Sequence, residues 1–150
     1  MSIKYLIAAI SSFVFLLLPG SVLASSLSLD PSTGTFNRSC PFSLNIKLDT
    51  AGVEIDGTDA YVLYDNSRFT ATTITPGTIF SEYSGSNVDD SAGKVAVSGL
   101  ASVSKGFSGQ GVLATVNFTV KENAPAGATQ IKFDFDPNNM TKTTDSNVVQ

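Results

Sequence analysis

The side chains best suited to chemistry or binding gather in residues 58–69, TDAYVLYDNSRF. In an extended strand, alternate residues share a side, so one face would carry Asp59, Tyr61 and Leu63. The opposite face would carry Ala60, Val62 and Tyr64. A strand at the surface of a sandwich normally has one apolar and one polar face, whereas both faces here hold apolar groups. The pattern predicts either a partner-binding face at Asp59, Tyr61 and Leu63 or a central strand whose second face is covered by a loop.

The sequence argues against an enzyme. It has no histidine among 150 residues, which excludes a Ser–His–Asp triad and removes the commonest transition-metal ligand. The stretch GFSGQG resembles a nucleophile elbow, but Gln110 stands where the motif needs glycine. The acidic pair Asp89 and Asp90 lies in a polar segment that predicts a solvated loop. We therefore expect no catalytic residues.

One stretch has a partial calcium-binding pattern. In DFDPNNMTKTTD, the residues at positions 1, 3, 5 and 12 of an EF-hand-like loop are Asp134, Asp136, Asn138 and Asp145. Position 6 is Asn139 rather than glycine, and no helix-forming pattern flanks the stretch. The alternative is that Asp134 and Asp136 are outward residues of a strand. We expect no cofactor in the domain itself, and we expect any calcium to be bound by a partner.

The first 24 residues have the features of a secretory signal peptide. Lys4 precedes an apolar run over 5–18, and small residues lead to a cleavage site between Ala24 and Ser25. We expect an exported domain over 25–150, extracellular or at the cell surface, with no membrane span after cleavage. A formal net charge of −4 argues against nucleic acid as a partner. The lone Cys40 is expected to be a small buried residue.

The region after the leader alternates apolar and polar residues in short runs separated by turn residues. The runs predict strands at 26–29, 41–48, 58–64, 68–74, 94–99, 111–121, 129–136 and 147–149. Phe42, Leu44, Ile46 and Leu48 would face inward, as would Val112, Ala114, Val116, Phe118 and Val120, and Ile131, Phe133 and Phe135. The pattern predicts an all-β fold, an antiparallel β-sandwich of about eight or nine strands with jelly-roll or immunoglobulin-like topology.

An ordered set of short motifs resembles the cohesin domain family. The set is Tyr64-Asp65, Phe69, Pro76-Gly77, Gly111, Ala114, Phe118, Ala124-Pro125 and Gly127. The resemblance extends from about Leu27 to Val149 and implies a nine-stranded jelly roll, a fold that some carbohydrate-binding modules share. The chain reaches Gln150 near the point where the last strand of the family would begin, so we expect either a fragment of a longer scaffold or a divergent single-module protein, in each case without that strand.

The resemblance also implies a function, because cohesins on extracellular scaffolds bind dockerin modules and assemble polysaccharide-degrading enzymes. By the same resemblance, Asp59 is a partner contact, Gly57 stands where a polar residue is usual, and Ser102 stands where an acidic one is usual. We therefore expect a secreted docking module with a dockerin-like partner. The alternatives are a carbohydrate-binding module, with Tyr61, Tyr83 and Phe107 as candidate exposed aromatics, and a structural adhesion domain.

Overall fold

The computed structural model describes residues 24–135 and 146–149, which form nine β-strands. The strands are β1 (Ser26–Asp30), β2 (Pro41–Asp49), β3 (Gly57–Leu63), β4 (Phe69–Pro76), β5 (Asn87–Asp89), β6 (Lys94–Leu100), β7 (Gln110–Val120), β8 (Lys132–Phe133) and β9 (Asn147–Val149). No helix occurs in these two ranges, and so none that could cross a membrane. The predicted all-β fold is confirmed.

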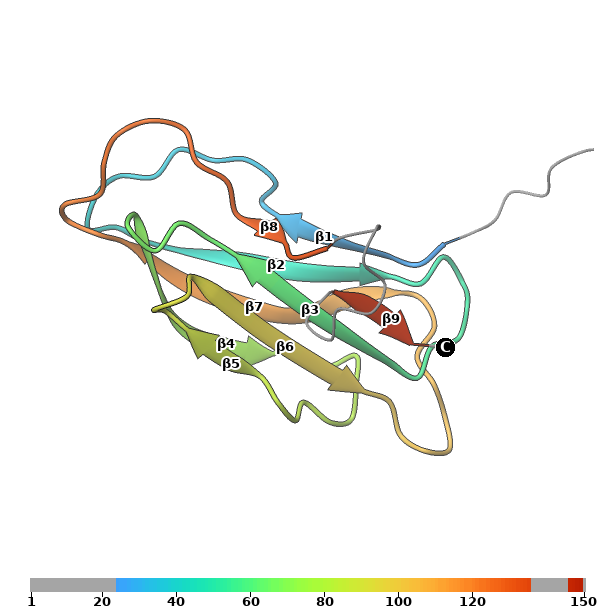
Figure 1. Cartoon of the computed structure of the whole chain (residues 1–150). Coiled ribbons are helices and arrows are strands. Elements are labelled where there is room, and N and C mark those ends of the chain that lie inside the picture. The colour runs from blue at the N-terminus through green and yellow to red at the C-terminus, as the bar shows by residue number, and fades with distance from the viewer. Residues whose placement is uncertain (1–23, 136–145, 150) are drawn as a thin grey trace, which may run out of the picture.

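The strands form two antiparallel sheets that pack face to face (Figure 1). One sheet has the order β1-β2-β7-β4. The other has the order β5-β6-β3-β8, and β9 also pairs with β3. β8 and β9 contact the same edge of β3 in turn, because β8 pairs with its end at Val62 and Leu63 and β9 pairs with its beginning. The antiparallel sandwich predicted from the alternating pattern is thus present.

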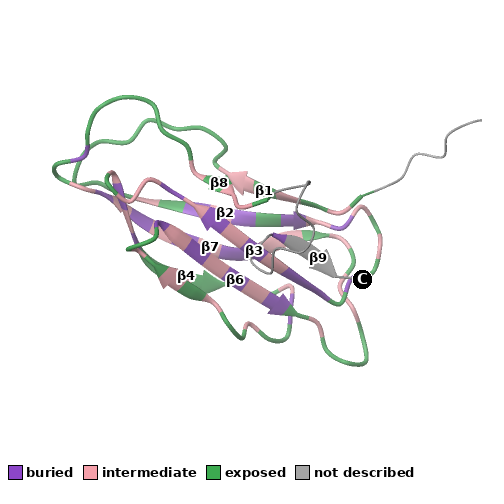
Figure 2. Cartoon of the chain, viewed as in Figure 1, coloured by how far each residue is buried: buried purple, intermediate pink, exposed green. Residues whose placement is uncertain are grey.

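The core lies between the sheets and is built from the alternate residues of the long strands, as the banding in Figure 2 shows. Phe118 of β7 is fully buried, and its ring lies near three other rings: Phe42, Phe69 and Tyr64. Tyr64 follows β3, so this contact joins the two sheets. Its hydroxyl donates to Asp90 Oδ1 at 2.7 Å, and burial, followed by this hydrogen bond, raises the pKa of Tyr64.

The expected inward phase of β7 is right from Ala114 onward and wrong before it. Leu113 is fully buried, whereas Val112 is only partly buried and pairs with the exposed Lys47. The register of β2 against β7 shifts between Ile46 and Lys47, which makes Leu113 an extra residue in the ladder. Such a bulge reverses the side on which the preceding residues point, and period-two reasoning carries straight across it.

The predicted strand over 129–136 is reduced to the two residues of β8, and Phe135 is 61% exposed rather than inward. Regular pairing with β3 stops at Phe133, because Tyr61 O next accepts a hydrogen bond from Asp134 N and Tyr61 N donates to Ser146 Oγ. Ser146 is buried against β3 and resumes the edge. Without a neighbouring strand, Phe135 has no core to enter.

Two further expectations need correction, and one lies outside the described residues. Cys40 is exposed, because β2 begins only at Pro41 and Cys40 lies in the turn before it. β5 is a strand that the alternating pattern does not predict, because its three residues are too few to show a period but enough to pair with β6. The proposed leader lies outside the described part of the chain, apart from Ala24.

Candidate functional site

The candidate site is the outward face of the β5-β6-β3-β8 sheet. Ala60, Val62 and Tyr64 are buried, while Asp59, Tyr61 and Leu63 are each partly exposed. β3 is a central strand, with β6 on one side and β8 and β9 on the other. The structure therefore brings the three predicted residues together in one row, half-buried by their neighbours on the sheet and not sealed off from solvent.

Asp59 is held in position by the adjacent strand. It pairs with Ser98 in the β3–β6 ladder, and Ser98 Oγ donates a hydrogen bond of 2.5 Å to Asp59 Oδ1. This bond engages one carboxylate oxygen, while a carboxylate can accept several hydrogen bonds. Asp59 is therefore an oriented acceptor on a partly exposed strand face.

Tyr61 lies beneath a cation that belongs to the same domain. Lys94 Nζ is 4.7 Å from the centroid of the Tyr61 ring, within the range of a cation–π contact. The same ammonium forms an ion pair of 3.0 Å with Asp134 Oδ2, and both side chains are mostly buried. The Lys94–Asp134 pair thus covers part of the Tyr61 ring and fixes its setting.

Sequence reasoning missed the apolar end of this face. Leu100, the last residue of β6, is 43% exposed and in phase with Lys94, Ala96 and Ser98. A Cβ atom at Gly57, its ladder partner, would lie 2.8 Å from Leu100 Cδ2, so the glycine makes room for the leucine. The signal that could have found Leu100 is alternation along KVAVSGL, which puts its first, third, fifth and seventh residues on one face.

Ser102 lies just beyond this face rather than on it. It is exposed in the turn after β6, where its hydroxyl lies 3.4 Å from Ser104 Oγ, and Lys105 N donates to its carbonyl at 3.1 Å. The neighbouring Val103 side chain is fully exposed. The turn extends the rim of the face past Leu100.

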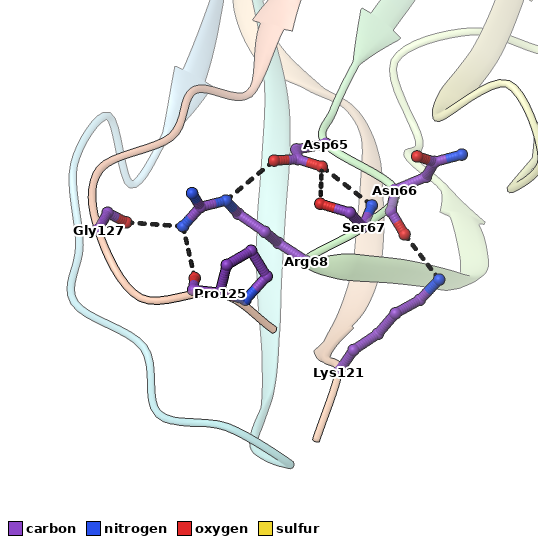
Figure 3. A network of polar contacts seen from close by, with 7 residues as sticks. All are labelled: Asp65, Asn66, Ser67, Arg68, Lys121, Pro125 and Gly127. Carbon is purple, nitrogen blue, oxygen red and sulfur yellow. Dashed lines mark hydrogen bonds and ion pairs between the residues drawn. The ribbon is translucent and has the colours of Figure 1, made fainter. Parts of the chain in front are cut away.

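Asp65 follows β3 and stabilises the turn into β4 (Figure 3). Asp65 Oδ1 accepts from Ser67 N at 2.9 Å and from Ser67 Oγ at 2.5 Å, while Oδ2 accepts from Arg68 Nε at 2.9 Å. The Ser67 hydroxyl, with smaller contributions from Ser67 N and Arg68, lowers the pKa of Asp65. These bonds hold the turn together, whereas Asp59 makes one cross-strand bond on the outward face.

The candidate catalytic segments are held in structural contacts. Within GFSGQG, Gly106 N donates to Glu54 Oε1, and Gly109 exchanges hydrogen bonds with Thr50. Asp90 accepts from the Tyr64 hydroxyl and from Ala71 N, so it is tied to the core rather than solvated as expected. Asp89 accepts from Ser91 Oγ, the main cause of its lowered pKa.

One residue of the calcium pattern, Asp134, lies in the described part of the chain. Asp134 forms the ion pair with Lys94, whereas Asp136, Asn138 and Asp145 lie outside the described residues. Within 24–135 and 146–149, no three His, Cys, Asp or Glu side chains are grouped to hold a metal ion.

The fold has many counterparts among solved structures. CaCohA2, in its complex with a single-residue variant of CaDoc0917, is 19% identical, with a TM-score of 0.64 over 83% of this chain and 86% of that one. The solution structure of CaCohA2 from Clostridium acetobutylicum is 20% identical, with a TM-score of 0.63 over 77% and 81%. The sixth cohesin of Acetivibrio cellulolyticus scaffoldin B, in complex with a mutant of the Cel5 dockerin, is 24% identical, with a TM-score of 0.59 over 74% and 82%.

These likenesses establish a shared fold at low identity. No curated protein matches the sequence. The sequence does match the description "Cohesin domain" over residues 41–149, from the first residue of β2 to the last of β9. Because that match spans most of the chain, the chain belongs to the cohesin domain family.

Proposed function

We propose that this chain is a secreted, non-catalytic docking module that binds a dockerin-like protein through the outward face of the β5-β6-β3-β8 sheet. The observation that carries the proposal is the half-exposed row of Asp59, Tyr61 and Leu63 on a central strand of a cohesin fold. Similar structures include complexes of cohesins with dockerins, which supports a protein partner.

The physical character of the row suits a protein interface. Protein interfaces combine aromatic anchors with a polar rim, and buried charged groups set specificity. Tyr61 supplies the aromatic group, Leu63 and Leu100 add aliphatic area, and Asp59 supplies an oriented acceptor. Ser102 belongs to the rim. A partner would place hydroxyl or cationic donors against Asp59.

The docking function is favoured over sugar binding. A carbohydrate-binding face usually stacks sugar rings on exposed aromatic side chains. Tyr61, Tyr83 and Phe107 are all partly buried, and the last two pack against the core. Polysaccharide enters the proposal only through context, since the partner would belong to an extracellular assembly that degrades it. The proposed leader, cleaved between Ala24 and Ser25, would deliver the domain there.

The test uses the domain from Ser25 onward as bait for proteins secreted by the same organism, with calcium and with a chelator. We expect calcium-dependent capture of a protein that carries a duplicated calcium-binding repeat, because in the proposed complex the partner binds the calcium. Bait with Asp59→Ala should lose the capture while keeping its melting temperature. Equal capture by both baits would contradict the proposed face, and retention on polysaccharide alone would favour the sugar-binding alternative.

A further inference from the structure

A cleft of about 1030 Å³ opens at one end of the sandwich, and it reaches the Leu63 end of the proposed docking face through Lys132, the ladder partner of Leu63. Its walls are the loop 31–40 between β1 and β2 and the loop 121–131 between β7 and β8, which lie at the same end of the molecule in Figure 1. Apolar residues of the core edge line it as well: Phe42, Leu44, Phe69 and Val120. The cleft therefore offers an apolar floor that extended side chains can reach.

The charge of the lining is opposite to that of the chain. The sequence contains two arginines, Arg38 and Arg68, and both line the cleft together with Lys132, whereas no Asp or Glu among the described residues does. The chain as a whole carries a net charge of −4. A cationic cleft in an acidic protein favours an anionic occupant.

The two arginines differ in how many of their guanidinium N–H groups are already hydrogen-bonded. Arg68 pairs with Asp65 through Nε and donates from Nη1 to the carbonyls of Pro125 and Gly127 (Figure 3). Arg38 donates from Nε to Ala124 O at 2.8 Å, and its Nη groups make no hydrogen bond to the described part of the chain. Arg38 can therefore bind a carboxylate through its remaining N–H groups.

The free edge of β1 leads into the same cleft. β1 pairs with β2 along one edge, and among the described residues no backbone group pairs with the other edge. Leu29 and Pro31, at the end of β1, belong to the lining. Alternate residues of an antiparallel edge strand point N–H and C=O groups outward, where they can pair with an added strand.

We propose that this region binds an extended acidic segment of a partner protein, which adds a strand to the free edge of β1 and continues into the cleft. Backbone hydrogen bonds to β1 provide affinity, apolar side chains of the segment reach the floor, and a carboxylate pairs with Arg38. A glycan fits less well, because Phe36 is the one exposed aromatic ring among the residues that line the cleft. The domain would then hold a second partner segment beside the proposed docking face.

The test uses a capped synthetic peptide of alternating valine and glutamate, with a valine–lysine peptide of equal length as control. Calorimetric titration should detect binding of the glutamate peptide and no binding of the lysine peptide. Hydrogen exchange should then slow in the fragment covering Ser26–Asp30. Arg38→Ala should weaken binding roughly fivefold, the size expected for one partly exposed charge contact. Lys105→Ala removes an exposed cation from a loop outside the cleft lining and should change nothing.

A second variant guards against a loss of folding in Arg38→Ala. Thr33→Glu places an acid at an exposed position of the lining without removing a hydrogen bond of the fold. It too should weaken binding of the glutamate peptide. Asp59→Ala should leave peptide binding intact, which separates this site from the proposed docking face. No detectable binding, or equal binding by both peptides, would overturn the proposal. Polygalacturonate is the glycan probe. If it binds, requires Arg38 and leaves hydrogen exchange in β1 fast, the ligand of the cleft is an acidic glycan and the peptide proposal is wrong.

Discussion

The two outward faces of the sandwich use their polar groups in different ways. On the β1-β2-β7-β4 sheet, Asn117 bridges three strands, since it accepts from Ser43 Oγ at 2.7 Å and donates to Thr73 Oγ1 at 2.9 Å. On the other sheet, Asp59 has one cross-strand bond, and apolar groups lie beside it. On the first face Asn117 is bonded to side chains of both neighbouring strands, whereas the second face keeps an acceptor and apolar area that a partner could contact.

This difference in hydrogen bonding affects what each face would gain by binding a partner. A face of mutually bonded hydroxyls and amides gains little by binding a partner, because each new bond must replace an existing one. A face with an oriented carboxylate and partly buried apolar side chains gains from excluding water. This difference supports the proposed docking face on β3.

The largest expected effect comes from breaking the core that supports both faces. Phe118→Ala should lower the free energy of unfolding by ~3–5 kcal/mol, because the fully buried ring leaves a cavity between the sheets. Urea denaturation measures the loss. Phe118→Leu, which keeps most of the apolar volume, should cost clearly less. A loss below about 1 kcal/mol for the alanine variant would contradict the central role of this ring.

The next effect separates the two faces by affinity. Asp59→Ala should weaken binding of the captured partner by about tenfold or more, since an interface residue that loses a charged hydrogen bond commonly costs over ~1 kcal/mol. Asn117→Ala is the matched substitution on the other sheet, and it should leave affinity unchanged. Calorimetric titration of both variants decides the matter. A loss of affinity in Asn117→Ala alone would move the interface to the opposite sheet.

A third effect separates the same faces by stability. Asn117→Ala should lower the free energy of unfolding by about 1 kcal/mol, because Ser43 and Thr73 both lose a partner. Thr119→Ala, two residues further along β7, is the control, because its hydroxyl takes no part in this bridge. Denaturation of the two variants side by side gives the comparison. Equal losses would mean that the cross-strand bonds of this face contribute nothing beyond ordinary strand burial.

The sequence predicted most of the fold because alternation survives wherever a strand is regular. It placed Leu44, Ile46, Leu48, Val116 and Phe118 correctly in the core. It failed at Val112, because a single extra residue reverses the phase, and at Phe135, because nothing local marks where pairing with β3 ends. Both are properties of the partner strand, which a run of apolar residues does not encode.

The site was only partly predictable for a similar reason. Asp59, Tyr61 and Leu63 emerge from one strand, so their common face follows from local alternation. Ser98, Lys94 and Leu100 join them only through the register of β3 with β6, which depends on long-range pairing. The Lys94–Asp134 contact, between residues far apart in the chain, also required the three-dimensional structure.

The smallest expected effect concerns Asp65, the acid that follows the strand of the proposed docking face and whose carboxylate holds a turn. The folded state lowers the pKa of Asp65, chiefly through Ser67, so the ionised carboxylate favours folding. This stabilisation is complete above the unfolded-state pKa and is lost as pH falls through the folded-state pKa. Asp65→Ala should therefore lower the melting temperature near neutral pH, and the gap from the parent protein should narrow as the pH falls through the lowered folded-state pKa of Asp65. Thermal melts across this pH range measure the gap. Ser67→Ala removes only the hydroxyl that donates to Asp65, and it should reproduce part of the fall in melting temperature. A gap that stays constant with pH would show that the turn depends on the shape of the side chain rather than its charge. The variant should also bind the partner as the parent does, because the bonds of Asp65 are made to Ser67 and Arg68.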